Sequence, residues 1–149
     1  MKNPNTGKTF LDIDDINSLL PEHLVLDTKS VSRSVYQAKD GSLISISNSK
    51  VYDKGYLCWY YAYVDRYVDM GVKYMLFTIG LKGLVLVPMD KIQNYKVGCY
   101  WKSGKNRGEK RYRFDIKVKQ ENSYVFINSS SRFDRELDLS DYFISFSSK

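Results

Sequence analysis

The chain has 149 residues and a formal net charge of +6, and 43% of its residues are hydrophobic while 27% are charged. This length fits one domain. The composition excludes a disordered chain and a membrane-embedded one, since no run approaches the roughly 18 apolar residues of a spanning helix. We therefore expect a single soluble domain over residues 1–149, with a flexible start at residues 1–9 and a frayed tail at residues 144–149.

The start of the sequence and its cysteine content predict a cytoplasmic location. The opening residues, MKNPNTGK, lack the apolar stretch of a secretory signal, and the chain has two cysteines, Cys58 and Cys99. With one histidine, His23, these distant cysteines cannot supply the four closely spaced ligands of a structural zinc site. We expect no metal site, no cofactor and, for this domain by itself, no catalytic residue.

The first predicted elements are a short helix and a hairpin. Apolar residues recur at near-helical spacing over residues 10–20, and Thr9 is the expected N-cap, with Asp12 three residues on. Residues 31–37 and 43–47 flank an Asp-Gly turn, which favours an antiparallel hairpin because Asp-Gly accepts the backbone twist of such turns.

Strands dominate the remainder of the chain. The predicted strands cover residues 56–64, 73–80, 84–87, 111–119 and 124–127. The predicted helical turns cover residues 65–71, 88–95 and 138–143, and residues 98–108 and 128–132 read as loops. This order indicates a mainly β protein with short helices, of the α+β class.

The entire surplus of positive charge lies between Lys102 and Lys119. This segment holds eight basic residues against two acidic ones, a difference of six that equals the net charge of the whole chain. A concentration of this kind raises the local potential enough to attract a polyanion, of which nucleic acid is the commonest.

Residues 111–119 alternate without a fault between polar and apolar side chains. Successive side chains on a strand point to opposite faces, so Tyr112, Phe114, Ile116 and Val118 should pack on the core. The other face should then carry a row of charges about 6.6 Å apart, comparable to the spacing of phosphates along one strand. Gly104 and Gly108 should leave the preceding basic loop free to adapt to a ligand. The alternative is a solvated edge strand whose cations prevent aggregation.

Aromatic residues are the second feature of this chain. Trp59, Tyr61 and Tyr63 share one strand face and Tyr60 takes the other, and burial is the expected use of this cluster. Tyr100 and Trp101 differ because they open the basic loop, where an aromatic ring beside cations could stack on a base. The candidate nucleic-acid-binding residues are Tyr100, Trp101, Lys102, Lys105, Arg107, Lys110, Arg111, Arg113, Lys117 and Lys119.

One catalytic pattern remains as an alternative. Asp90 after Pro88-Met89, together with Asp115 and Lys117, loosely matches the PD-(D/E)xK nuclease motif, in which two acids bind magnesium and a lysine orients water. Three departures weaken it: an extra residue follows the proline, Asp90 falls on a predicted helix, and Arg113 and Lys117 flank Asp115 and would repel a cation.

The order of several segments resembles DNA-recognition domains attached to prokaryotic restriction endonucleases. The segments are Ile-Ser-Asn-Ser-Lys at residues 46–50, Trp59-Tyr60, residues 83–88, the strand at residues 111–119, and Asp-Leu-Ser-Asp-Tyr at residues 138–142. The resemblance implies an open antiparallel β-barrel or pseudobarrel that binds DNA in the major groove through loops and strand ends.

These observations predict a non-catalytic DNA-binding domain that gives target recognition to a restriction or defence nuclease. The expected partners are double-stranded DNA and a nuclease domain or subunit, and no membrane. The alternatives are a small magnesium-dependent nuclease and a basic module that binds an acidic protein.

Overall fold

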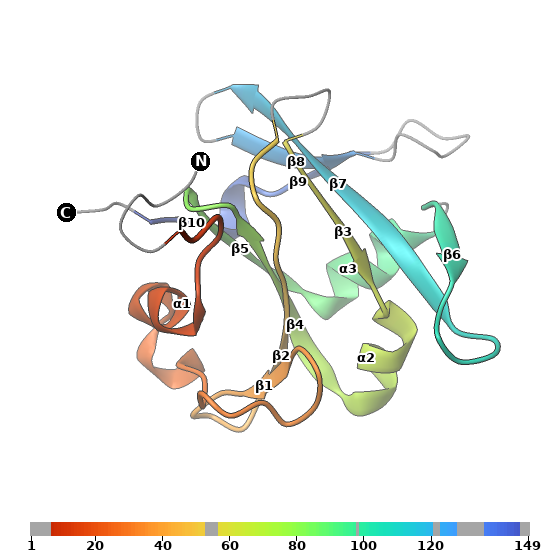
Figure 1. Ribbon diagram of the computed structural model, residues 1–149, viewed down its shortest axis with the longest axis horizontal. Coiled ribbons are helices and arrows are strands. Elements are labelled where there is room, and N and C mark those ends of the chain that lie inside the picture. The colour runs from red at the N-terminus through yellow and green to blue at the C-terminus, as the bar shows by residue number, and fades with distance from the viewer. Residues whose placement is uncertain (1–6, 53–56, 98, 121–122, 128–135, 147–149) are drawn as a thin grey trace.

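A computed structural model describes residues 7–52, 57–97, 99–120, 123–127 and 136–146, with residues 119 and 120 described by their backbone. The strands form two sheets (Figure 1). The mainly β class with short helices is therefore confirmed. Within these ranges the longest helix has eight residues, and no described helix is long and apolar enough to cross a membrane.

The first sheet has the strand order β1-β2-β4-β5-β10. Its strands are β1 (Val35–Gln37), β2 (Leu43–Ser47), β4 (Val72–Ile79), β5 (Gly83–Pro88) and β10 (Phe143–Ser145). The predicted hairpin is confirmed, with β1 antiparallel to β2. Strand β2, however, runs parallel to β4, so this sheet is mixed and the expectation of an antiparallel fold is wrong for this pair.

The second sheet has the order β3-β7-β8-β9, with β6 also paired to β7. Its strands are β3 (Cys58–Ala62), β6 (Trp101–Ser103), β7 (Lys110–Gln120), β8 (Ser123–Ile127) and β9 (Glu136–Asp138). All its pairs are antiparallel. The predicted strands near residues 111–119 and 124–127 are confirmed, and they pair with each other. Among the described residues the pairings do not close a barrel.

The helices are short and have local causes. They are α1 (Ile13–Leu19), α2 (Val64–Met70), α3 (Met89–Lys96) and the 3₁₀ turns η1 (Glu22–Leu24) and η2 (Ser140–Tyr142). Helix α1 begins with a capping box, in which the Asp12 side chain accepts from the Asp15 N–H at 2.9 Å and the Asp15 side chain accepts from the Asp12 N–H at 3.2 Å. The N-cap is thus Asp12, and the prediction of Thr9 is wrong.

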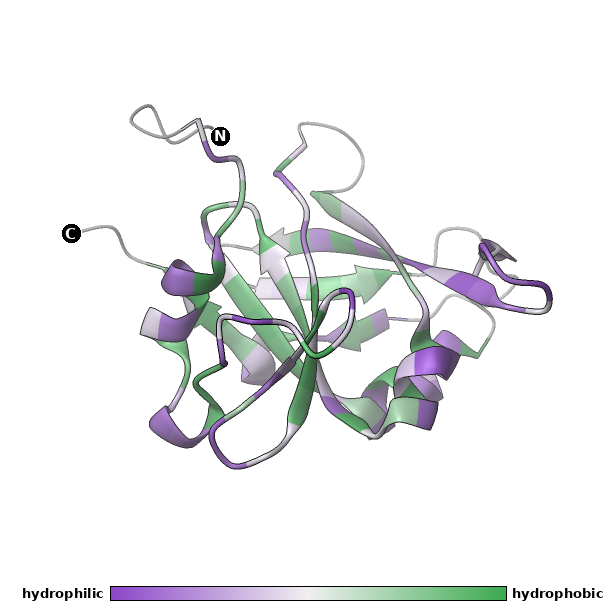
Figure 2. Cartoon of the chain, turned by 60° about the horizontal axis from the view of Figure 1, so that its bottom comes forward, coloured by the Kyte–Doolittle hydropathy of each residue, from purple (hydrophilic) through white to green (hydrophobic). Residues whose placement is uncertain are grey.

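The core lies mainly between the two sheets. Phe77 of β4 is fully buried, and its ring lies 5.0 Å from those of Tyr60 and Phe126. Tyr95 of α3 stacks on Phe114 and Phe126, so α3 covers the inner face of the second sheet. A separate apolar cluster, which includes Ile16 and Leu24, fills the other face of the first sheet. Figure 2 shows the central strands mostly green, with purple residues along α1.

Residues near both termini of the described chain are attached to the fold. Lys8 Nζ lies 2.9 Å from carboxylate oxygens of Asp12 and Asp15. Ile144 pairs with Leu84, and the Phe146 N–H donates to the Lys82 carbonyl. The predicted loop at residues 128–132 lies outside the described residues, as do residues 1–6 and 147–149.

Candidate nucleic-acid interface

The second sheet has an outer face on which aromatic and basic side chains alternate. Across β3 and β7, Tyr61 is the partner of Arg113 and Trp59 is the partner of Asp115. Across β6 and β7, Lys102 is the partner of Arg111. Paired residues of neighbouring strands share a face, so these side chains lie together, opposite the buried Tyr112, Phe114 and Ile116. The strand alternation predicted from the sequence is confirmed for these core positions.

Cations lie over the aromatic rings of this face. The Tyr61 ring has three basic neighbours, with Lys102 Nζ 4.4 Å, Arg111 Cζ 5.6 Å and Arg113 Cζ 5.9 Å from its centroid. Arg113 Cζ is also 5.2 Å from the Trp59 centroid. These distances are those of cation–π contacts. We call Trp59, Tyr61, Lys102, Arg111 and Arg113 the aromatic–cation face.

Asp115 and Val118 depart from the predicted alternation of exposed and buried residues. Asp115 is buried, and its Oδ1 accepts from Arg113 Nε at 2.8 Å, whereas Val118 is 45% exposed instead of packing on the core. Burial lowers the pKa of Arg113, but the hydrogen bond and charge of Asp115 outweigh it and hold the pKa above its ordinary value. Asp115 thus orients Arg113 and offsets its charge, which leaves Arg111 and Lys102 as the stronger sources of positive potential here.

The basic loop is fixed to helix α2. Arg66 donates to both oxygens of Glu109, at 2.7 and 2.9 Å, and its guanidinium lies 4.1 Å from the Tyr63 centroid. The Lys105 N–H donates to Tyr63 Oη at 3.3 Å. A Cβ on Gly104 would lie 2.6 Å from the Tyr63 ring, so this glycine permits close packing and does not supply the expected freedom. The Arg66 hydrogen bonds lower the pKa of Glu109, so the pair is ionised at neutral pH.

Of the two candidate aromatics of the loop, Trp101 lies on the opposite side from the aromatic–cation face. Trp101 pairs with the inward-facing Tyr112, and Lys110 Nζ lies 4.6 Å from the Trp101 centroid, so this pair is on the opposite side from Lys102. The Tyr100 carbonyl accepts from the Arg113 N–H at 2.9 Å. Both aromatic side chains are exposed, Tyr100 by 46% and Trp101 by 45%.

The remaining candidates surround these groups without joining one cluster. Lys105 and Arg107 are exposed on the β6–β7 loop, and Lys117 is exposed farther along β7. The side chain of Lys119 lies outside the described part of the structure.

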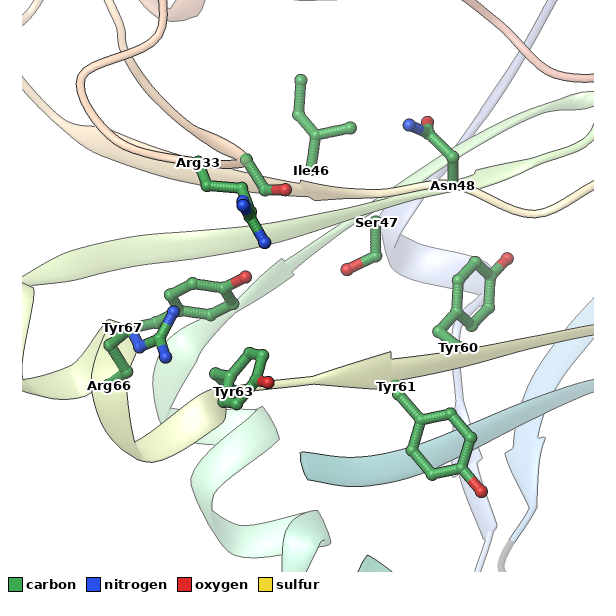
Figure 3. A pocket seen from close by; sticks show the side chains of 10 residues that line it. Arg33, Ile46, Ser47, Asn48, Tyr60, Tyr61, Tyr63, Arg66 and Tyr67 are labelled. Carbon is green, nitrogen blue, oxygen red and sulfur yellow. The ribbon is translucent and has the colours of Figure 1, made fainter. Parts of the chain in front are cut away.

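A groove between β2 and β3 was not predicted (Figure 3). It consists of two hollows of about 250 and 360 Å³ that share Asn48, Tyr60 and Tyr61. Arg33 and Arg66 line the first hollow, and Lys50 lines the second. The only sequence signal was the tyrosine cluster at residues 60–63, because the arginines come from distant segments.

The acids of the nuclease alternative are not brought together. Asp90 is exposed on α3, which packs on the inner face of the second sheet, whereas Asp115 belongs to the outer face. No group of three or more histidine, cysteine, aspartate or glutamate residues that could hold a metal occurs within the described ranges. The geometry therefore gives no support to a two-acid magnesium site.

Comparison of the chain with protein-family models, curated proteins and solved structures finds no match.

Proposed function

We propose that this chain is a non-catalytic nucleic-acid-binding domain that contacts DNA through the aromatic–cation face. In this proposal it supplies target recognition to a restriction or defence nuclease, as the sequence resemblance implies. The open pseudobarrel of those recognition domains belongs to the same proposal. The observation that supports DNA binding is the convergence of Lys102, Arg111 and Arg113 on the ring of Tyr61.

The mixture of rings and cations favours nucleic acid over an acidic protein. An acidic protein would require only the charges, whereas nucleic acid offers phosphates to the cations and planar bases to the rings. Trp59 and Tyr61 are half-buried and lie in an edge-to-face contact, with centroids 5.7 Å apart. Such fixed rings lose little conformational freedom when a base stacks on them.

The salt dependence of binding tests the proposal. Each phosphate contact releases condensed counterion, so log K falls with log salt by about 0.9 per contact on duplex DNA. The double variant Lys102→Ala/Arg111→Ala should therefore flatten the slope by about 1.8 and weaken binding. Arg113 is kept, because it also orients the buried carboxylate of Asp115.

A second double variant controls for total charge. Lys29 and Lys91 are exposed and lie outside the aromatic–cation face, so Lys29→Ala/Lys91→Ala should leave the slope unchanged. If both double variants fold and flatten the slope equally, binding depends on net charge and the face is wrongly assigned. Failure of the wild-type protein to bind duplex or single-stranded DNA at low salt would reject the proposal in favour of an acidic protein partner.

A further inference from the structure

We propose that the groove between β2 and β3 receives one unpaired nucleobase from the nucleic acid bound on the aromatic–cation face. This inference rests on the proposed function and specifies its ligand, a nucleic acid with a nucleotide outside the base-paired stack. It assigns a role to a groove of which most residues lie outside the basic segment.

The walls of the groove suit a planar ring with polar edges. The first hollow is lined by Tyr60 and Tyr61 of β3, by Tyr67 of α2 and by Tyr63, which lies between these elements. Ser47, at the end of β2, lines it from the other side, and in Figure 3 its side chain points across toward β3. Four of the ten lining residues are tyrosines, and serine, asparagine and arginine side chains supply the polar groups that would fix the orientation of a bound ring.

The size of the groove is also adequate. Its two hollows, of about 250 and 360 Å³, adjoin at Tyr60 and Tyr61. Binding sites for small molecules usually measure about 300–1,000 Å³, so each hollow is near the lower end of this range, which suits a single base.

The charge at the groove favours a phosphate beside the base. The described lining of the first hollow contains Arg33 and Arg66 and no carboxylate. Arg66 is neutralised by Glu109 outside the lining, while Arg33 is exposed at the mouth. In Figure 3 the Arg33 side chain points toward Tyr67 and Arg66. The second hollow adds Lys50, whose Nζ lies 5.1 Å from the Tyr52 centroid.

The backbone beside the groove is strained. Ser34 lines the first hollow with φ 65°, and among the described residues it is the one non-glycine residue with positive φ. Such a conformation is energetically unfavourable for a residue other than glycine and is concentrated at functional sites. The Ser34 carbonyl accepts from the Ile46 N–H at 2.8 Å, which holds the strained residue against the β2 wall.

Tyr61 connects the two sites. Its ring lies beneath Lys102 on the aromatic–cation face, and the same residue lines both hollows. A strand held on that face therefore passes the mouth of the groove at Tyr61. A base within a duplex cannot enter, because it is paired and stacked, whereas an unpaired base can leave the strand at a small energetic cost.

The test compares two DNA probes by fluorescence anisotropy. One is a perfect duplex of about 12 base pairs, slightly more than one helical turn, and the other is the same duplex with one unpaired nucleotide. Stacking of one base predicts about tenfold tighter binding of the second probe. Ser47→Leu, which fills the groove without a charge change, should abolish this preference and leave perfect-duplex affinity unchanged.

Two further variants keep the test decisive. Ser30→Leu places the same side chain on an exposed residue outside the groove lining and should retain the preference. Arg33→Gln should reduce the preference even if Ser47→Leu does not fold. Equal affinity of the wild-type protein for both probes, or a preference that survives in folded Ser47→Leu and Arg33→Gln, would overturn the inference while leaving the proposed function intact. Failure to bind either probe would instead reject the proposed function.

Discussion

Strands β4 and β7 show how differently the two sheets meet solvent. On β4 every residue from Met75 to Ile79 is buried, because the core lies on one face and the cluster under α1 on the other. On β7 the inner Tyr112, Phe114 and Ile116 are buried, while Arg111 and Arg113 are half-buried and Lys117 is exposed. The buried residues of α2 and α3 belong to the inner core. The first sheet therefore has an apolar cluster packed on each face, whereas the second sheet has the core on one face and the aromatic–cation face on the other.

The largest expected effect tests this contrast with two aromatic truncations. Phe77→Ala should lower the free energy of unfolding by about 3–5 kcal/mol, because the ring fills the space between the sheets. Tyr61→Ala should lower the free energy of unfolding by about 1 kcal/mol, since removing the ring removes its cation–π contacts at the surface. Urea denaturation measures both. Equal losses would show that the outer face is a structural surface like those of the first sheet.

A smaller effect on stability is expected at alkaline pH, from Tyr112 on the inner face of β7. Burial, followed by the hydrogen bond that Tyr112 donates to Asp65, raises the pKa of Tyr112 from 10.0 to about 12. Because the folded-state pKa is the higher one, the contribution of Tyr112 to stability is complete below pH 10 and is lost as pH rises to about 12. The loss should be on the order of 2 kcal/mol.

Tyr112→Phe provides the control for this titration. Denaturation midpoints measured from about pH 9 to pH 11 should fall less steeply in the variant than in the wild-type protein. Parallel curves would mean that other groups, such as the fully buried Tyr60, account for the alkaline loss.

The smallest effect concerns the helix that covers the first sheet. Asp12→Ala removes the side-chain cap of α1 and should cost about 1 kcal/mol. Hydrogen exchange should accelerate in α1 and remain unchanged in β3 and β7, because the core cluster that contains Ile16 of α1 includes no described residue of either strand. Equal acceleration in β3 would show that the two sheets open as one unit.

Much of the fold could be predicted where residues alternate or form long apolar runs. The alternation at residues 111–119 identified the buried Tyr112, Phe114 and Ile116. The alternation failed at Val118, which extends beyond the packed core and is exposed. It also failed at Asp115, because the ion pair with Arg113 permits burial of this carboxylate. Strands β6, β9 and β10 were not predicted, since three-residue strands give almost no periodic signal.

The candidate site could be predicted in composition but not in arrangement. The sequence identified the basic segment and the shared face of Trp59, Tyr61 and Tyr63, yet it assigned those rings to the interior. These rings lie on the same face as the cations because β3 pairs with β7, a contact between distant segments of the chain. The groove was missed for the same reason, because residues 33–34, β2 and β3 meet there only in the folded chain.

The parallel pairing of β2 with β4 has a consequence for the folding kinetics. Between these strands the chain leaves the first sheet, contributes β3 to the second, and returns, so that Ser45 pairs with Met75. β3 in turn pairs with β7, which lies far along the chain, so that Tyr61 is the partner of Arg113. Such distant pairings slow folding to the range of about milliseconds to seconds. The strands of each sheet are separated along the chain by strands of the other sheet. If the chain is cut between β3 and α2, each fragment should therefore remain unfolded until the two associate.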